Sequence, residues 1–171
     1  MKKINSIFYI IICLGLILSA CSNASIKEEQ KKAEERVVEL FKGEHKKPNT
    51  ESDGLNFYMP TGVSIDQSKK NNIILKRGKK VYILFYNPNE GRSSEVIYQS
   101  TLEPTEKYRV NKTFTDQDGR FGYLLIRDIA EDEYELVVGV GGVKLTTQTD
   151  ADEIAFDAEL MIEIASSIEQ K

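Results

Sequence analysis

Tryptophan is absent from the 171 residues, histidine occurs once, and cysteine occurs only at Cys13 and Cys21. With one histidine and two cysteines, the chain cannot build a zinc site from several thiolates and imidazoles, and it cannot build a network of disulfides. Any Ser–His–Asp arrangement would have to use His45. That residue lies between Glu44 and Lys46 in a polar segment, which predicts a solvated surface histidine.

Only one long apolar run is present, over residues 4–18. It follows Lys2 and Lys3, precedes the small residues Ser19 and Ala20, and is shorter than the roughly 20 residues that span a bilayer. This order is typical of a cleaved secretory signal, so we predict a signal peptide over residues 1–20.

Leu18-Ser19-Ala20-Cys21 resembles the lipobox of bacterial lipoproteins. The resemblance implies cleavage before Cys21 and a lipid, with fatty acyl groups such as palmitate, on its sulfur. It also implies that the chain is lipid-anchored at the extracytoplasmic face of the cell membrane. An ordinary signal followed by an incidental cysteine is the alternative. With Cys13 removed and Cys21 acylated, no thiol would remain for nucleophilic or redox chemistry.

The formal net charge is −4, and removal of Lys2 and Lys3 makes it more negative. An acidic surface argues against binding to nucleic acid and against electrostatic docking on anionic headgroups. We therefore expect no nucleic-acid partner.

Residues 26–42 have the pattern of a helix, with an apolar face formed by Ala33, Val37, Leu40 and Phe41. Its first half, rich in Lys and Glu, is expected to form a solvated stalk. Residues 43–54, GEHKKPNTESDG, have the composition of a linker. We therefore assign residues 21–54 to an N-terminal helix and linker, and residues 55–171 to a globular domain.

From Leu55 onward the apolar pattern has a period of two, interrupted by turn residues. It predicts an antiparallel meander of seven or eight strands, over residues 55–59, 72–77, 80–87, 95–101, 108–115, 121–127 and 134–140 and continuing through 147. A C-terminal helix is expected over residues 151–169, with Asp150 and Glu153 at the spacing of a capping box.

Both faces of the central strands are apolar. In VYILFY, Val81, Ile83 and Phe85 point to one side of the strand, and the intervening Tyr82, Leu84 and Tyr86 point to the other. A sheet with one wet face would alternate with polar residues. The pattern predicts the α+β class, with helices on both faces of the sheet in a three-layer sandwich.

Two segments resemble PsbP-like and Mog1-like domains: GLNFYMPTGVSID, and DGRFGYLLIRDIAEDEYELVVGVGGVKLTTQT followed by a long helix. The resemblance covers residues 55–168, although Val63 stands where many members have tryptophan. It implies the fold and mostly non-catalytic binding or assembly roles.

Short motifs offer little chemistry. Asp116-Gln117-Asp118-Gly119 only partly resembles the start of a calcium loop, and a hairpin turn at Asp118-Gly119 is the simpler interpretation. The glycines from Gly139 to Gly142 follow a strand and precede no helix, so they predict a bulge or turn and not a phosphate site. No catalytic residue and no metal ligand is predicted.

Basic residues gather around the predicted hairpin of residues 72–87. They form a basic edge, which is interpreted as a solvated tip or as a contact for an anionic partner, and consist of Lys69, Lys70, Lys76, Arg77, Lys79 and Lys80.

Together these features predict a non-catalytic, lipid-anchored binding or assembly module of the bacterial cell envelope. It would use no cofactor, and its partner would be a protein or a cell-wall component. A carboxylate-based hydrolase of the envelope and a small-ligand-binding lipoprotein stay open as alternatives. The residues that bind the partner are not identified by sequence.

Overall fold

The computed structural model describes residues 26–169, and Cys21 lies outside this range. A seven-stranded antiparallel sheet forms the centre of the fold and confirms the α+β class. Its strands are β3 (Ser64–Lys69), β4 (Asn72–Arg77), β5 (Lys80–Tyr86), β6 (Tyr108–Thr115), β7 (Phe121–Ala130), β8 (Glu133–Val140) and β9 (Val143–Asp150). A separate hairpin consists of β1 (Thr50–Ser52) and β2 (Leu55–Phe57).

The strand order is β3-β4-β5-β9-β8-β7-β6, so the sheet is not the single meander that the sequence predicted. It consists of two meanders, and the chain crosses from β5 at the centre to β6 at the far edge. The crossing segment contains the short helix α2 (Val96–Thr101), in a region that was wrongly predicted as a strand. Sequence periodicity fixes which residues alternate within a strand, but not which strands become neighbours.

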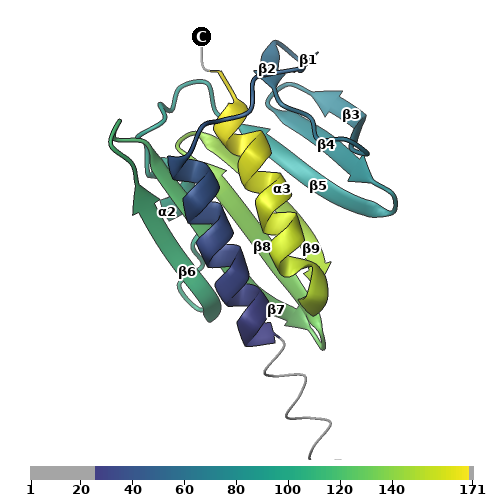
Figure 1. Cartoon of the computed structure of the whole chain (residues 1–171), viewed down its shortest axis with the longest axis vertical. Helices are drawn as coiled ribbons and strands as arrows, with labels where there is room; N and C mark the ends of the chain where they lie inside the picture. The colour runs from purple at the N-terminus through teal and green to yellow at the C-terminus, as the bar shows by residue number, and fades with distance from the viewer. Residues whose placement is uncertain (1–25, 170–171) are drawn as a thin grey trace, which may run out of the picture.

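Two long helices pack on the same face of the sheet (Figure 1). They are the N-terminal helix (residues 26–42) and α3 (Ile154–Ser167), which follows a 3₁₀ turn, η1 (Ala151–Glu153). Ion pairs Arg36–Glu159 and Lys46–Glu163 show that the two helices run in the same direction. We expected these helices to cover the two faces of the sheet. Among residues 26–169, the opposite face is covered only by α2 and its flanking loops.

The N-terminal helix is docked along its whole described length, so the stalk expected over its first half is wrong. Ile26 is 3% exposed, and Ala33, Val37 and Phe41 are fully buried. Burial of a large apolar side chain contributes about 1.5–3 kcal/mol. The half-exposed ion pair between Arg36 and Glu159 adds less than about 1 kcal/mol. Apolar burial, and not surface charge, therefore holds the helix against the sheet.

A smaller apolar cluster lies on the opposite face, under α2. It contains Phe121, Tyr123, Leu125 and Val137 of the sheet, with Tyr98 of α2 and two flanking residues packed against it. Ring centroids of Tyr98 and Tyr123 are 5.3 Å apart. Arg127 of β7 also holds the loop after α2 on this face, because it forms ion pairs with Glu103 and Glu106 of that loop.

The local structure agrees with the sequence at one turn and differs at a helix start and two strands. The turn at Gly141 and Gly142 joins β8 to β9, as predicted. The predicted capping box does not form, since Asp150 makes no side-chain cap and Glu153 bonds Lys80 instead. The predicted linker contains strand β1, and β3 was not predicted. Between residues 26 and 169, no helix is long and apolar enough to cross a membrane.

Gly139 lies against the ring of Tyr123, and a Cβ atom there would come within 2.2 Å of the ring. Tyr123 is fully buried, so its ring has no space to withdraw. Gly139→Ala should therefore lower the free energy of unfolding by about 1–3 kcal/mol, measured by urea denaturation.

Gly91→Ala is the matched control, because nothing lies within 4 Å of the position that its Cβ would take. That variant should stay within about 0.5 kcal/mol of the parent chain. Equal effects of the two substitutions would contradict the close packing of Tyr123 on Gly139.

Candidate functional site

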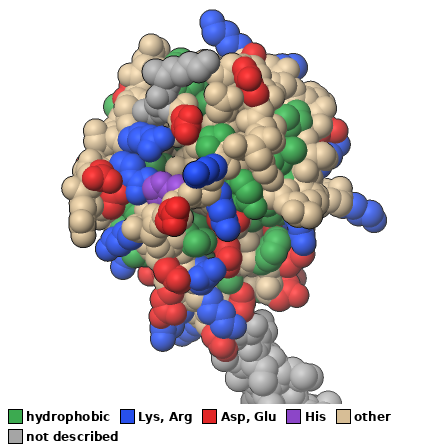
Figure 2. All heavy atoms as spheres, turned by 45° about the horizontal axis from the view of Figure 1, so that its top comes forward, with side chains coloured by type: hydrophobic (Ala, Val, Ile, Leu, Met, Phe, Trp, Pro, Cys, Tyr) green, Lys and Arg blue, Asp and Glu red, His purple; other side chains and the backbone are tan. Residues whose placement is uncertain are grey.

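A cleft of about 950 Å³ opens at the end of the sheet where the N-terminal helix ends. It lies between the last residues of that helix, the loop at Arg92 and Ser93, and the β6–β7 turn. Figure 2 shows this end of the molecule, with the single histidine, in purple, surrounded by basic and acidic side chains. The turn residues lining the cleft are Thr115, Asp116, Gln117, Asp118, Gly119 and Arg120.

Arg120 forms the floor of the cleft and is only 8% exposed. Its Nε donates to Asp116 Oδ2 at 2.5 Å, and its Nη2 donates to the Phe41 carbonyl oxygen at 2.9 Å. The guanidinium also lies 5.0 Å from the centre of the Phe41 ring. These contacts join the β6–β7 turn to the end of the N-terminal helix and hold the cleft in one shape.

His45 is half-buried and bonded, so the predicted solvated histidine is wrong. Its Nε2 lies 3.0 Å from the Phe41 carbonyl oxygen, and Arg120 Nη1 lies 2.9 Å from both ring nitrogens. Because a carbonyl oxygen can only accept, the contact with Phe41 assigns the proton to Nε2, and Nδ1 is then the ring nitrogen that can accept from Arg120. The ring therefore contributes to the wall of the cleft and does not point freely into water.

Both carboxylate oxygens of Asp116 also accept hydrogen bonds. Its Oδ1 accepts from the backbone N–H groups of Asp118 and Arg120, both at 3.0 Å. Burial favours a higher pKa for this carboxyl, but the hydrogen bonds from Arg120 and Asp118 outweigh it and lower the pKa below its usual range. Asp116 therefore organises the predicted Asp118-Gly119 turn, which the structure confirms.

The open part of the cleft is formed by exposed polar side chains, Lys42, Ser93, Gln117 and Asp118. They surround a rigid floor and carry charges of both signs. Such a surface suits recognition of a polar segment of another molecule. No group of three or more His, Cys, Asp or Glu side chains within residues 26–169 could hold a metal ion.

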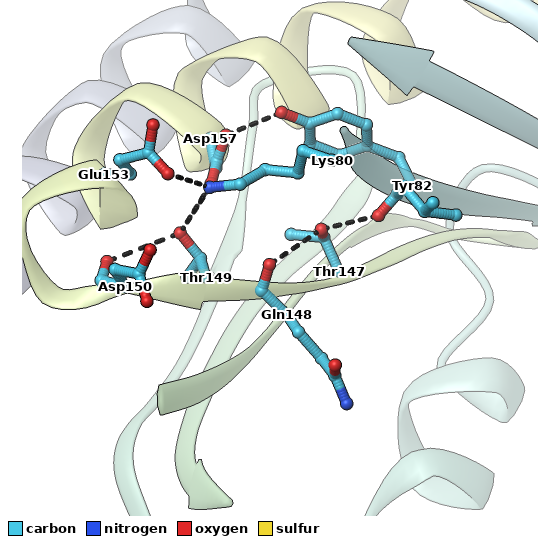
Figure 3. Close-up of polar contacts among 9 residues, drawn as sticks. Lys80, Tyr82, Thr147, Gln148, Thr149, Asp150, Glu153 and Asp157 are labelled. Carbon is cyan, nitrogen blue, oxygen red and sulfur yellow. Dashed lines mark hydrogen bonds and ion pairs between the residues drawn. The ribbon is translucent and has the colours of Figure 1, made fainter. Parts of the chain in front are cut away.

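A second charged cluster lies at the opposite end of the fold, where β5 begins and α3 starts (Figure 3). Asp157 is 1% exposed and accepts hydrogen bonds from three donors. These are Tyr82 Oη at 2.7 Å, Lys80 Nζ at 2.6 Å and Thr149 Oγ1 at 2.5 Å. Lys80 also bonds Glu153. The network connects α3 to β5 and β9 through a buried charge that is fully partnered.

Lys80 and Tyr82 of this network have raised pKa values. Burial alone would lower the pKa of Lys80, but hydrogen bonds and charges from Asp157 and Glu153 outweigh it and raise the pKa. Burial and the bond to Asp157 raise the pKa of Tyr82 far above its usual value. Both groups therefore keep their protons near neutral pH, which fits a structural network better than acid–base catalysis.

The hydrolase alternative requires two buried carboxylates that face each other. Within residues 26–169, the two well-buried aspartate side chains, Asp116 and Asp157, lie at opposite ends of the sheet. Each is paired with a basic side chain. Asp157 has Glu153 nearby, but Lys80 lies between them. The described residues thus lack the geometry that this alternative needs.

The predicted basic edge does not form one surface. Lys69 and Lys70 lie at the β3–β4 turn, whereas Arg77, Lys79 and Lys80 lie at the β4–β5 turn, one strand length away. Lys80 is ion-paired with Asp157, and Lys76 Nζ bonds Asp66 at 2.7 Å. The fold therefore places basic residues that are close in sequence at two separate turns.

A smaller cavity of about 470 Å³ lies beside the β1–β2 hairpin. Its apolar lining includes Leu55, Ile73, Leu84 and Tyr86, and its polar lining includes Lys70 and Glu169. This volume falls in the range of small-molecule sites. It is the place in the described residues that the small-ligand alternative would use.

Sequence reasoning missed the two clusters, although one signal was present. Asp157 follows Ile154 by three residues and precedes Met161 by four, so it lies on the apolar stripe of α3. A carboxylate on a buried stripe requires a partner. Lys80 is on the same face of β5 as Tyr82 and Leu84, and supplies it. Arg120 gave a weaker signal: Asp116 lies four residues before it, but its other partners, Phe41 and His45, are distant in sequence.

No protein-family model matches the sequence, and no curated protein matches it. The structure is similar to the solution structure of cyanobacterial PsbP (CyanoP) from Synechocystis sp. PCC 6803. The TM-score is 0.41 with 11% sequence identity, over 70% of this chain and 88% of that chain. The similarity is distant.

Asp157→Asn should destabilise the fold, because it leaves Lys80 without its buried counter-charge. Loss of one partner of a buried ion pair costs about 3–5 kcal/mol. The expected result is a free energy of unfolding lowered by about this amount, measured by urea denaturation. Asp152→Asn, on the exposed side of η1, is the control and should change little. A loss below about 1 kcal/mol for Asp157→Asn would show that the network is not a structural link.

Proposed function

We propose that the chain is a non-catalytic, lipid-anchored binding or assembly module of the bacterial cell envelope. A lipid on Cys21 would hold it at the extracytoplasmic face of the cell membrane. The partner, a protein or a cell-wall component, would bind at the cleft around Arg120. The Leu18–Cys21 motif and the short apolar run before it support the anchor.

The observation that carries the proposal is the docked N-terminal helix. Four residues separate Cys21 from Ile26, and the five steps from one to the other can span at most roughly 17 Å when fully extended. Since Ile26 is already buried against the sheet, the anchor and the domain would have little slack between them. The domain would therefore stay close to the bilayer.

The same helix supports the position of the binding surface. Residues 26–42 extend over about 25 Å, at 1.5 Å per residue, and end at the cleft. Figure 1 shows the two ends of this helix at opposite ends of the molecule. A lipid at the start of the helix would direct the cleft away from the bilayer, toward molecules of the envelope.

Lipidation predicts the result of a single substitution. Cys21→Ala should leave the chain unprocessed or release it to the medium, because the modified sulfur is removed. The measurement is immunoblotting of membrane and medium fractions. Cys13→Ala, within the signal, is the matched control and should behave as the parent chain. Membrane retention of a correctly cleaved Cys21→Ala product would contradict the anchor.

Binding at the cleft predicts position-specific crosslinking in cells. A photoreactive residue at Gln117, in the open part of the cleft, should give a discrete adduct on illumination. The same residue at Gln67, exposed on the edge strand β3, should not give that adduct. Lys42→Glu should weaken the Gln117 adduct by reversing a charge at the cleft. Identical adduct patterns from the two positions would contradict a partner at this cleft.

A further inference from the structure

The described residues cover only half of the sheet face opposite the two long helices. One row of side chains crosses this face through successive strand pairs: Gln67, Ile74, Ile83, Thr146, Val137, Leu125 and Asn111. Val137 and Leu125 are 2% and 1% exposed beneath α2, whereas Ile83 is 47% exposed. Coverage therefore ends between β8 and β5, and the β4–β5 half is open.

The open half carries apolar side chains that the fold does not require. On β5, Val81 is 38% exposed, and Phe85 lies on the same face as Ile83. The adjacent strand β9 has Lys144, Thr146 and Gln148 on this face. The polar residues of β9 show that the fold does not require apolar side chains on this part of the face. Folding alone therefore does not explain the apolar residues of β5. Exposed apolar residues that adjoin one another mark interaction sites.

Basic groups dominate the unpaired charges around this surface. A cleft of about 740 Å³ lies here, and its lining includes Lys79, Val81 and Ile83. Two of the carboxylates that line it are already paired, Glu135 with Arg127 and Glu153 with Lys80. Among residues 26–169, Lys79 and Lys144 have no acidic partner, and Asp150 is the one lining carboxylate without a basic partner.

The covered half shows what kind of element fits this face. There, α2 places Tyr98 over the sheet, with its ring against those of Phe121 and Tyr123. We infer that the open β4–β5–β9 surface binds an amphipathic helix of a partner protein, one with an apolar stripe flanked by acidic residues. The stripe would cover Ile83 and Val81, and the acidic flanks would meet Lys79 and Lys144. This surface is distinct from the Arg120 cleft and independent of the lipid.

Two labelled helical peptides test the inference. They have the same leucine stripe, flanked by glutamates in one and by lysines in the other. Binding to the chain of residues 21–171 carrying Cys21→Ser is measured by fluorescence anisotropy. We expect the acidic peptide to bind about tenfold tighter than the basic one, and added salt to reduce the difference.

Three variants locate the binding surface. Ile83→Thr keeps a β-branched residue in the strand and should lower the affinity for the acidic peptide about tenfold. Lys79→Glu with Lys144→Glu should reverse the preference between the peptides. Val96→Thr is the matched control, since Val96 on α2 is 53% exposed, and it should bind as the parent chain does. Urea denaturation of each variant verifies folding.

Four results would overturn the inference. The first is acidic-peptide binding that Ile83→Thr leaves unchanged, and the second is equal binding of the two peptides. The third is self-association of the parent chain that Ile83→Thr abolishes, which would assign the surface to a second copy. The fourth is binding to phosphatidylglycerol vesicles that Ile83→Thr abolishes, which would assign it to the bilayer. Since the assay omits the lipid, none of these results depends on the anchor.

Discussion

Packing of both long helices on one face of the sheet is the constraint that shapes the rest of the molecule. With the N-terminal helix over β6 and β7 and α3 over β8 and β9, neither is available for the opposite face. The chain covers part of that face with α2 as it crosses from β5 to β6. The remaining part, around Ile83, stays open because no further element of residues 26–169 reaches it.

Two charged clusters secure this arrangement at its opposite ends. At one end, Asp157 links α3 to β5 and β9; at the other, Arg120 links the N-terminal helix to the β6–β7 turn. Apolar packing alone would hold the helices on the sheet, but it is tolerant of sliding. Buried hydrogen bonds have specific geometry, and we infer that these two fix the position of each helix.

The sequence predicted the α+β class and the bounds of β4, β6 and the N-terminal helix, because alternation and helical periodicity are local properties. It did not predict that β5 pairs with β9, since pairing depends on contacts between distant residues. The two-sided apolar pattern of β5 was interpreted as burial on both faces. Tyr82 and Leu84 are buried as expected, but Val81 and Ile83 are not. For the candidate site, His45 was visible in sequence, but its bond to Arg120 required the fold.

A docked N-terminal helix has a different consequence from a flexible stalk. A stalk would let an anchored domain rotate freely, so that each of its surfaces would meet the bilayer and the envelope in turn. With Ile26 buried, only four residues would lie between an anchor at Cys21 and the docked helix. An anchor at that position would therefore present the Arg120 cleft and the Ile83 surface in a restricted range of directions. Restricted orientation raises the effective concentration of a surface toward a partner that is itself held in the envelope.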